Sequence, residues 1–121
     1  MKSVAIRFVL YHAQISPQIK TPQLYTVLEY DSQHNKVFRS SLSKPEANYH
    51  LWNESSAPFL LSTNPSTLTL KLYSKEYSRF RDELIGQTTL EINQLGVASL
   101  PLLDRRNRQT GTLLLGVTLS Q

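Results

Sequence analysis

The chain has 121 residues, of which 40% are hydrophobic and 18% charged, an ordinary composition for one globular domain. It contains no cysteine, which excludes disulfides, thiol catalysis and thiolate metal sites and is compatible with a reducing compartment. The net charge of +4 permits anionic partners without requiring them, and no apolar run approaches the roughly 20 residues that a membrane span needs.

Short segments with the two-residue period of a half-buried strand recur along the chain. The clearest contains Leu68, Leu70 and Leu72, which alternate with polar residues. Eight strands are predicted, at residues 3–11, 24–30, 36–42, 49–61, 68–73, 84–92, 98–103 and 112–119. No segment has an apolar 3.6-residue period over three turns, so no long helix is expected. The sequence therefore predicts an all-β fold, an eight-stranded antiparallel sandwich.

Two of these strands carry further detail. The fourth is interrupted by Ser-Ser-Ala-Pro, so we expect it to bend or bulge near Pro58. In the last strand the inward-facing positions are Leu113, Leu115, Val117 and Leu119. The loops are predicted at residues with turn-forming chemistry, and 43–48, with Pro45, is one of them.

Five segments in this order resemble a C2 domain, a Greek-key sandwich used for membrane and protein docking. They are residues 4–13, Trp52-Asn53-Glu54, residues 68–73, Leu84-Ile85-Gly86-Gln87 and residues 111–117. The strand that comes first in one circular permutation of the family comes last here, which is similar to the type II topology of phosphoinositide-specific phospholipase C-delta. The resemblance implies one C2-like domain over residues 1–121, a fragment of a larger multidomain protein, with no enzymatic activity and no cofactor.

The resemblance also predicts a degenerate calcium site. Calcium-binding members carry acidic residues at the start of the second strand, where this chain reads Gln-Leu-Tyr, and in the loop after the fifth strand. The corresponding loop positions are Ser74, Glu76 and either Asp82 or Glu83. Calcium needs 6 to 8 oxygen ligands with enough negative charge, and Lys75, Arg79 and Arg81 oppose a cation here. We therefore expect no metal site.

Alternate loops of an up-and-down sandwich emerge at one end, which gathers basic residues there. The candidates for binding a lipid or a protein partner are Lys20, Lys75, Arg79, Phe80, Arg81, Arg105, Arg106 and Arg108. Phe80 either inserts into a lipid headgroup region or folds back onto the sandwich. Burying Phe80 contributes roughly 2 kcal/mol and each cation about 1 kcal/mol, so one copy binds a membrane no tighter than about 0.1 mM. Membrane targeting would then need a second contact, through dimerisation or another domain.

Less specific interpretations compete with these candidates. A segment such as 105–108 is more often a solvated loop than a ligand site. Lys36 and Arg39 on the third strand are a thin version of the lysine-rich face of lipid-binding relatives. For these two cations a plain polar strand face is preferred. The six tyrosines either form an aromatic patch for a protein partner or reflect the preference of strands for tyrosine.

Enzymatic interpretations find less support. His12, His34 and His50 are scattered, no Gly-x-Ser-x-Gly elbow is present, and nearby arginines would hold any carboxylate pair ionised. The leading hypothesis is a calcium-independent docking module for a protein partner, cytoplasmic and either free or peripheral to a membrane or the cytoskeleton. The alternative is weak binding to anionic phospholipid or phosphoinositide. No nucleic acid and no small-molecule substrate are expected.

Overall fold

The structure is a computed structural model that describes residues 3–17, 23–30, 35–62, 67–75, 81–91 and 95–119. All regular structure in these ranges is β-strand, and every strand pair is antiparallel. The strands are β1 (Ser3–Ile15), β2 (Leu24–Tyr30), β3 (Asn35–Arg39), β4 (Lys44–Glu46), β5 (Tyr49–Ser55), β6 (Phe59–Ser62), β7 (Thr67–Ser74), β8 (Glu83–Glu91), β9 (Gly96–Leu103) and β10 (Gln109–Leu119). The predicted all-β antiparallel class is confirmed.

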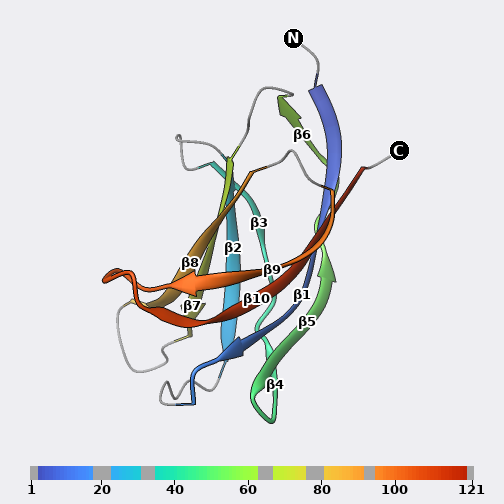
Figure 1. Ribbon diagram of the computed structural model, residues 1–121. Helices are drawn as coiled ribbons and strands as arrows, with labels where there is room; N and C mark the ends of the chain where they lie inside the picture. The colour runs from blue at the N-terminus through green and yellow to red at the C-terminus, as the bar shows by residue number, and fades with distance from the viewer. Residues whose placement is uncertain are drawn as a thin grey trace.

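The strands form two layers that share one seam. Their order is β3-β2-β7-β8-β9-β10-β1-β5-β4, with β6 paired to β1. At the junction of β8 and β9 one residue pair, Gln87 with Leu103, joins the two halves. Figure 1 shows β9 and β10 crossing in front of β2, β7 and β8. We call β3-β2-β7-β8 the β2 sheet and β9-β10-β1-β5 the β1 sheet.

The core lies between these two layers and follows the alternation of the sequence. Leu68, Leu70 and Leu72 on β7 have no exposed surface, and the same holds for Leu113 and Leu115 on β10. Leu119, in contrast, was predicted to face inward but is 53% exposed. This prediction is wrong because Leu119 is the last residue of β10, beyond Val117, where the buried cluster ends.

The described residues form ten strands where eight were predicted for the chain. The predicted fourth strand is divided into β5 and β6, which confirms the interruption near Pro58. Ser56 maintains the contact with β1 across this break, since its N–H donates to the Phe8 carbonyl at 2.8 Å and its Oγ accepts from the Phe8 N–H at 3.0 Å. The additional strand is β4, which pairs with β5 inside the segment predicted as a loop.

The predicted third strand ends at Arg39 rather than Leu42, and two serines explain the change. Ser40 donates its N–H to the Thr26 carbonyl, while its Oγ accepts from the Thr26 N–H at 2.8 Å. Ser43 repeats both contacts with Leu24, where its Oγ accepts at 2.9 Å. Serine hydroxyls thus replace backbone carbonyls as acceptors for β2, so the chain stays attached without a regular ladder.

Described parts of three connections lie at one end of the molecule, as the alternation predicted. The Ser16 N–H, just after β1, donates to the Thr110 carbonyl of β10 at 2.8 Å. The Lys75 N–H, just after β7, donates to the Gln23 carbonyl at 3.1 Å. We call the region formed by residues 16–17 and 23, residues 75 and 81–82, and residues 104–108 the loop end.

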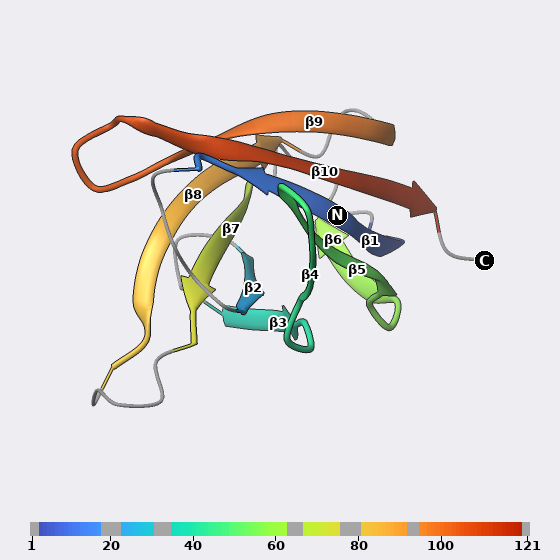
Figure 2. The same cartoon turned by 90° about the horizontal axis from the view of Figure 1, so that it is seen from below.

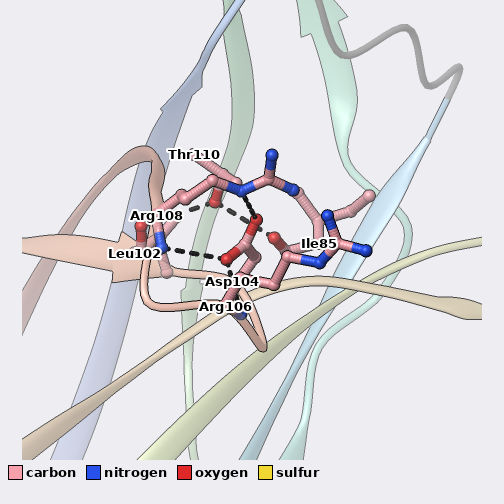
Figure 3. Close-up of polar contacts among 6 residues, drawn as sticks. All are labelled: Ile85, Leu102, Asp104, Arg106, Arg108 and Thr110. Carbon is pink, nitrogen blue, oxygen red and sulfur yellow. Dashed lines mark hydrogen bonds and ion pairs between the residues drawn. The ribbon is translucent and has the colours of Figure 1, made fainter.

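Thr110 closes the seam at the loop end. Its hydroxyl donates to the Ile85 carbonyl of β8 at 3.0 Å and lies 3.4 Å from the Leu102 carbonyl of β9 (Figure 3). Gly86 permits this approach, because a Cβ at that position would lie 2.7 Å from the Thr110 Oγ1. Three strands from both sheets therefore meet around one hydroxyl group.

Candidate functional site

The outward face of the β2 sheet carries a stacked pair of tyrosines. Leu24, Thr26 and Leu28 face the core, so the alternate residue Tyr25 points to the other side. The strand register places Tyr25 directly opposite Tyr73 of β7. Their rings stack with centroids 5.4 Å apart and planes inclined by 20°. This pair is worth about 1 kcal/mol beyond its burial and forms a rigid aromatic floor.

Asp82 holds the tyrosine pair from the β7–β8 connection. The Tyr25 hydroxyl donates to Asp82 Oδ2 at 2.6 Å, and Lys75 Nζ lies 3.8 Å from the same oxygen. Burial, together with the hydrogen bond to Asp82, raises the pKa of Tyr25 to about 12. The hydroxyl therefore stays protonated at neutral pH and remains a donor.

Two arginines complete a pocket over this floor. The Arg39 guanidinium of β3 lies 4.4 Å from the centroid of the Tyr25 ring, a cation–π contact. Arg81 is exposed at the start of the segment before β8. The pocket has a volume of about 300 Å³ and is lined by Tyr25, Val27, Arg39, Tyr73, Arg81 and Asp82. We call it the aromatic pocket.

The charges of the aromatic pocket suit an anionic group. Two arginines and one aspartate line the pocket, and the carboxylate of this aspartate already accepts a hydrogen bond from Tyr25. Guanidinium groups bind carboxylates and phosphates through paired, planar hydrogen bonds. The arrangement can therefore hold an acidic side chain or a phosphate against an aromatic surface.

The second basic feature is the turn between β9 and β10, residues 104–108, which we call the arginine turn. Asp104 Oδ1 accepts from the backbone N–H groups of Arg106 and Arg108, both at 2.9 Å, and Asp104 Oδ2 accepts from Arg108 Nε at 3.0 Å (Figure 3). Asn107 adopts the left-handed conformation, with φ of 60°, which suits asparagine in a tight turn. The hydrogen bond from the Arg108 N–H is the main cause that lowers the pKa of Asp104.

The carboxylate of Asp104 divides the arginines of this turn into two kinds. Arg108 forms an ion pair with Asp104, whereas the side chains of Arg105 and Arg106 are exposed and extend from a hydrogen-bonded backbone. The turn is thus an ordered support for two exposed cations.

The eight predicted binding residues fall into three groups. Lys20, Arg79 and Phe80 lie outside the described residues, so the two alternatives for Phe80 stay predictions. Arg81, Arg105 and Arg106 are exposed at the loop end. Lys75 and Arg108 each lie against a carboxylate, Asp82 and Asp104 respectively.

The sequence analysis missed the pocket floor and the part of Arg39 in it. Arg39 was preferred as part of a plain polar strand face; it is exposed on β3, and its guanidinium also lies over the Tyr25 ring. The available signal was the strand alternation, which places both Tyr25 and Tyr73 on the face of their strands that points away from the core. The register of β2 against β7, which places the two rings opposite each other, cannot be predicted from the sequence of either strand alone.

Of the predicted calcium-ligand positions, Glu76 lies outside the described residues, and the described positions do not form a cluster. Ser74 is 2% exposed and faces the core, while Asp82 binds the Tyr25 hydroxyl. In the described ranges no three or more His, Cys, Asp or Glu side chains gather where they could hold a metal ion. Nor do these ranges contain a helix long and apolar enough to cross a bilayer.

Comparison with solved structures identifies the fold. No protein-family model and no curated protein sequence matches the chain. The structure has the C2 fold, which confirms the predicted resemblance at the level of architecture. The circular permutation and the degenerate calcium site stay predictions.

Three solved structures illustrate the likeness. A C2 domain of plant extended synaptotagmin 1 superposes with a TM-score of 0.75 at 14% identity, over 99% of this chain and 97% of that one. A structure described as a C2 domain gives 0.69 at 18% identity, over 98% and 99%. Human GIVD cytosolic phospholipase A2 gives 0.68 at 14% identity, where the match covers 98% of this chain but 17% of the enzyme.

Proposed function

We propose that the chain is a calcium-independent, non-enzymatic docking module whose aromatic pocket binds an acidic side chain of a protein partner. The observation that carries this proposal is the placement of Arg39 over the stacked pair of Tyr25 and Tyr73. The C2 fold agrees with it, since C2 domains commonly bind proteins or phospholipid membranes.

The composition of the pocket favours a protein partner. Tyrosine and arginine are enriched among the residues that dominate the binding energy of protein interfaces. Tyr25 is held by its stacking partner and by Asp82, so the pocket floor loses little conformational freedom on binding. Arg39 packs on the Tyr25 ring and presents its guanidinium in a restricted orientation.

Anionic phospholipid is the second candidate, and the exposed pair Arg105 and Arg106 supports it. It ranks second because two of the predicted lipid contacts, Lys75 and Arg108, already lie against carboxylates. Those pairs reduce the positive surplus that would attract an anionic surface. Binding through the remaining cations is weak and sensitive to salt.

Calcium independence rests on the surroundings of Asp82. A calcium ion would need this carboxylate and several further oxygens, but Asp82 accepts from Tyr25 and lies beside Lys75. Millimolar calcium should leave the melting temperature unchanged relative to a chelator, because a ligand that binds only the folded state raises it. A rise in melting temperature on adding calcium would contradict this part of the proposal.

Two matched double variants test the proposal. Arg39→Ala/Arg81→Ala removes two cations from the pocket, and Arg105→Ala/Arg106→Ala removes two from the turn, so the change in net charge is the same. Binding is measured first to an array of aspartate- and glutamate-rich peptides, with control peptides in which asparagine and glutamine replace the acidic residues. It is then measured to phosphatidylcholine vesicles with and without phosphatidylserine or phosphoinositide.

The outcomes separate the two candidates. We expect the pocket variant to weaken acidic-peptide binding about tenfold or more and the turn variant to change it little. Peptide binding that falls equally in both variants would show that net charge alone is responsible. Salt-sensitive vesicle binding without peptide binding would instead establish the phospholipid candidate.

We further propose that residues 1–121 are one module of a larger cytoplasmic protein, near a membrane or the cytoskeleton. The phospholipase A2 match supports a modular use, since the similar fold there makes up 17% of a longer chain.

A further inference from the structure

Strand β9 has an open edge. It pairs with β10 along its length, from Gly96 with Val117 to Leu103 with Gln109. Within the described residues its other edge meets β8 at a single pair, Leu103 with Gln87. Figure 2 shows β9 as the outermost strand of its layer, with β8 curving away toward the other layer. The edge from Gly96 to Ser99 is therefore open for pairing with another strand.

This edge lacks the protection that the other sheet edges carry. Charged residues, proline and short length normally prevent an edge strand from pairing with another chain. Edge strand β4 is three residues long and reads Lys-Pro-Glu, β6 has four residues, and β3 contains Lys36 and Arg39. The segment 95–103 reads Leu-Gly-Val-Ala-Ser-Leu-Pro-Leu-Leu and contains no charge. Its proline, Pro101, lies near the end already closed by β8.

Exposed apolar side chains gather beside the same edge. In the described residues the large hydrophobic side chains that are exposed include Val97 at 64%, Leu95 at 53% and Leu119 at 53%. Val97 pairs with Gly116 and Gly96 with the buried Val117, so Leu119 lies near the same end of the β9–β10 pair but on the other face from Val97. An apolar surface of this kind next to open backbone groups is typical of an interaction site.

The position of Pro101 indicates which backbone groups face outward. A strand proline is tolerated where its nitrogen points away from the hydrogen-bonded neighbour, so the Pro101 nitrogen belongs on the side away from β10. Backbone groups alternate along a strand, which places the N–H and C=O of Val97 and Ser99 on that same open side. These two residues offer two donors and two acceptors.

We propose that β9 pairs antiparallel with β9 of a second copy of this chain, about a two-fold axis beside Ala98. Val97 then exchanges hydrogen bonds with Ser99 of the second copy, and the reverse, which satisfies all four groups. Close to a two-fold axis each side chain lies near its own copy, so a charge at or beside Ala98 would face a like charge. The uncharged segment 95–103 fits this symmetry, and the pairing buries Leu95 and Val97 of both copies.

Sedimentation velocity over a micromolar to millimolar concentration series tests this proposal. Wild-type mass should rise to that of a dimer, while Val97→Lys should stay monomeric, with a dissociation constant at least about tenfold higher. Leu60→Lys is the matched control, since Leu60 on β6 is 70% exposed and receives the same charge away from β9; it should dimerise like wild type. A monomeric wild type at every concentration, a dimeric Val97→Lys or a monomeric Leu60→Lys would each overturn the proposal.

A cross-linking measurement checks the register. The natural chain has no cysteine, so Ala98→Cys introduces a single thiol, and pairing about the axis places the two Cα atoms within disulfide range. We expect Ala98→Cys to form a disulfide-linked dimer under mild oxidation faster than Leu60→Cys at the same concentration. Equal rates for both variants would contradict the β9 register.

Discussion

The aromatic pocket and the arginine turn are two basic regions at the loop end that hold their arginines in different ways. In the pocket, Arg39 packs on a ring that is itself fixed by Tyr73 and Asp82. In the turn, Asp104 orders the backbone and binds Arg108, while Arg105 and Arg106 extend into solvent. A similar count of arginines therefore gives a shaped site in one place and two exposed charges in the other.

This difference determines what each region can recognise. A guanidinium restrained against an aromatic ring favours a ligand of matching geometry, because less freedom is lost when it binds. Exposed arginines attract any anion within the screening length, which is about 8 Å at physiological ionic strength. Specific docking is thus expected at the pocket and diffuse attraction at the turn.

Removing the pocket floor should give the largest effect. Tyr25 is 7% exposed, so Tyr25→Ala should lower the free energy of unfolding by about 3 kcal/mol through the loss of a large buried side chain. Tyr25→Phe keeps the ring and loses the hydrogen bond to Asp82, with an expected cost of about 1 kcal/mol. Urea denaturation measures both. Equal costs for the two variants would show that the stacked ring contributes little.

The seam below the arginine turn should be less costly to disturb. Thr110→Val keeps the side-chain shape but removes the donor to the Ile85 carbonyl, for an expected loss of about 1 kcal/mol in urea denaturation. Acidic-peptide binding should stay within about twofold of wild type, since Thr110 does not line the pocket. A large loss of peptide binding would mean that the two regions are coupled.

The stability should also depend on pH through His50, which lies apart from both regions. Ser43 Oγ accepts from the Leu24 N–H, so its hydroxyl hydrogen is free to donate to His50 Nδ1, 2.8 Å away, and this requires a neutral ring. Burial lowers the pKa of His50 below its usual value. As the pH falls below about 6.5, the unfolded chain takes up this proton first, and the free energy of unfolding should decrease until the folded-state pKa is passed.

Thermal melts between pH 5 and 8, with His50→Gln for comparison, measure this contribution. The wild type should lose stability on acidification more steeply than the variant. Parallel pH profiles would show that His50 does not contribute.

The smallest global effect is expected at the arginine turn. Asp104→Ala removes the acceptor for the Arg106 and Arg108 N–H groups, so these two amides should exchange faster with deuterium. The melting temperature should change little because the turn is exposed, and the amides of Tyr25 and Tyr73 should keep their exchange rates. Unchanged exchange at Arg106 and Arg108 would show that Asp104 does not order the turn.

The sequence predicted the layers of the fold because a strand with one buried face alternates apolar and polar residues, as Leu68, Leu70 and Leu72 do with their neighbours. It misplaced strand ends where side chains took over the role of the backbone, as Ser40 and Ser43 do beside β2. It predicted a basic loop end, yet it missed the pocket. Tyr25, Arg39 and Tyr73 come from three strands, and their meeting depends on strand register, which no single segment encodes.

The most direct test of the account is a chemical-shift map of the backbone amides during titration with an acidic peptide selected from the array. We expect the largest changes at Tyr25, Arg39, Tyr73 and Arg81, with small changes at Arg105 and Arg106. Largest changes at the arginine turn, with an unperturbed aromatic pocket, would contradict it.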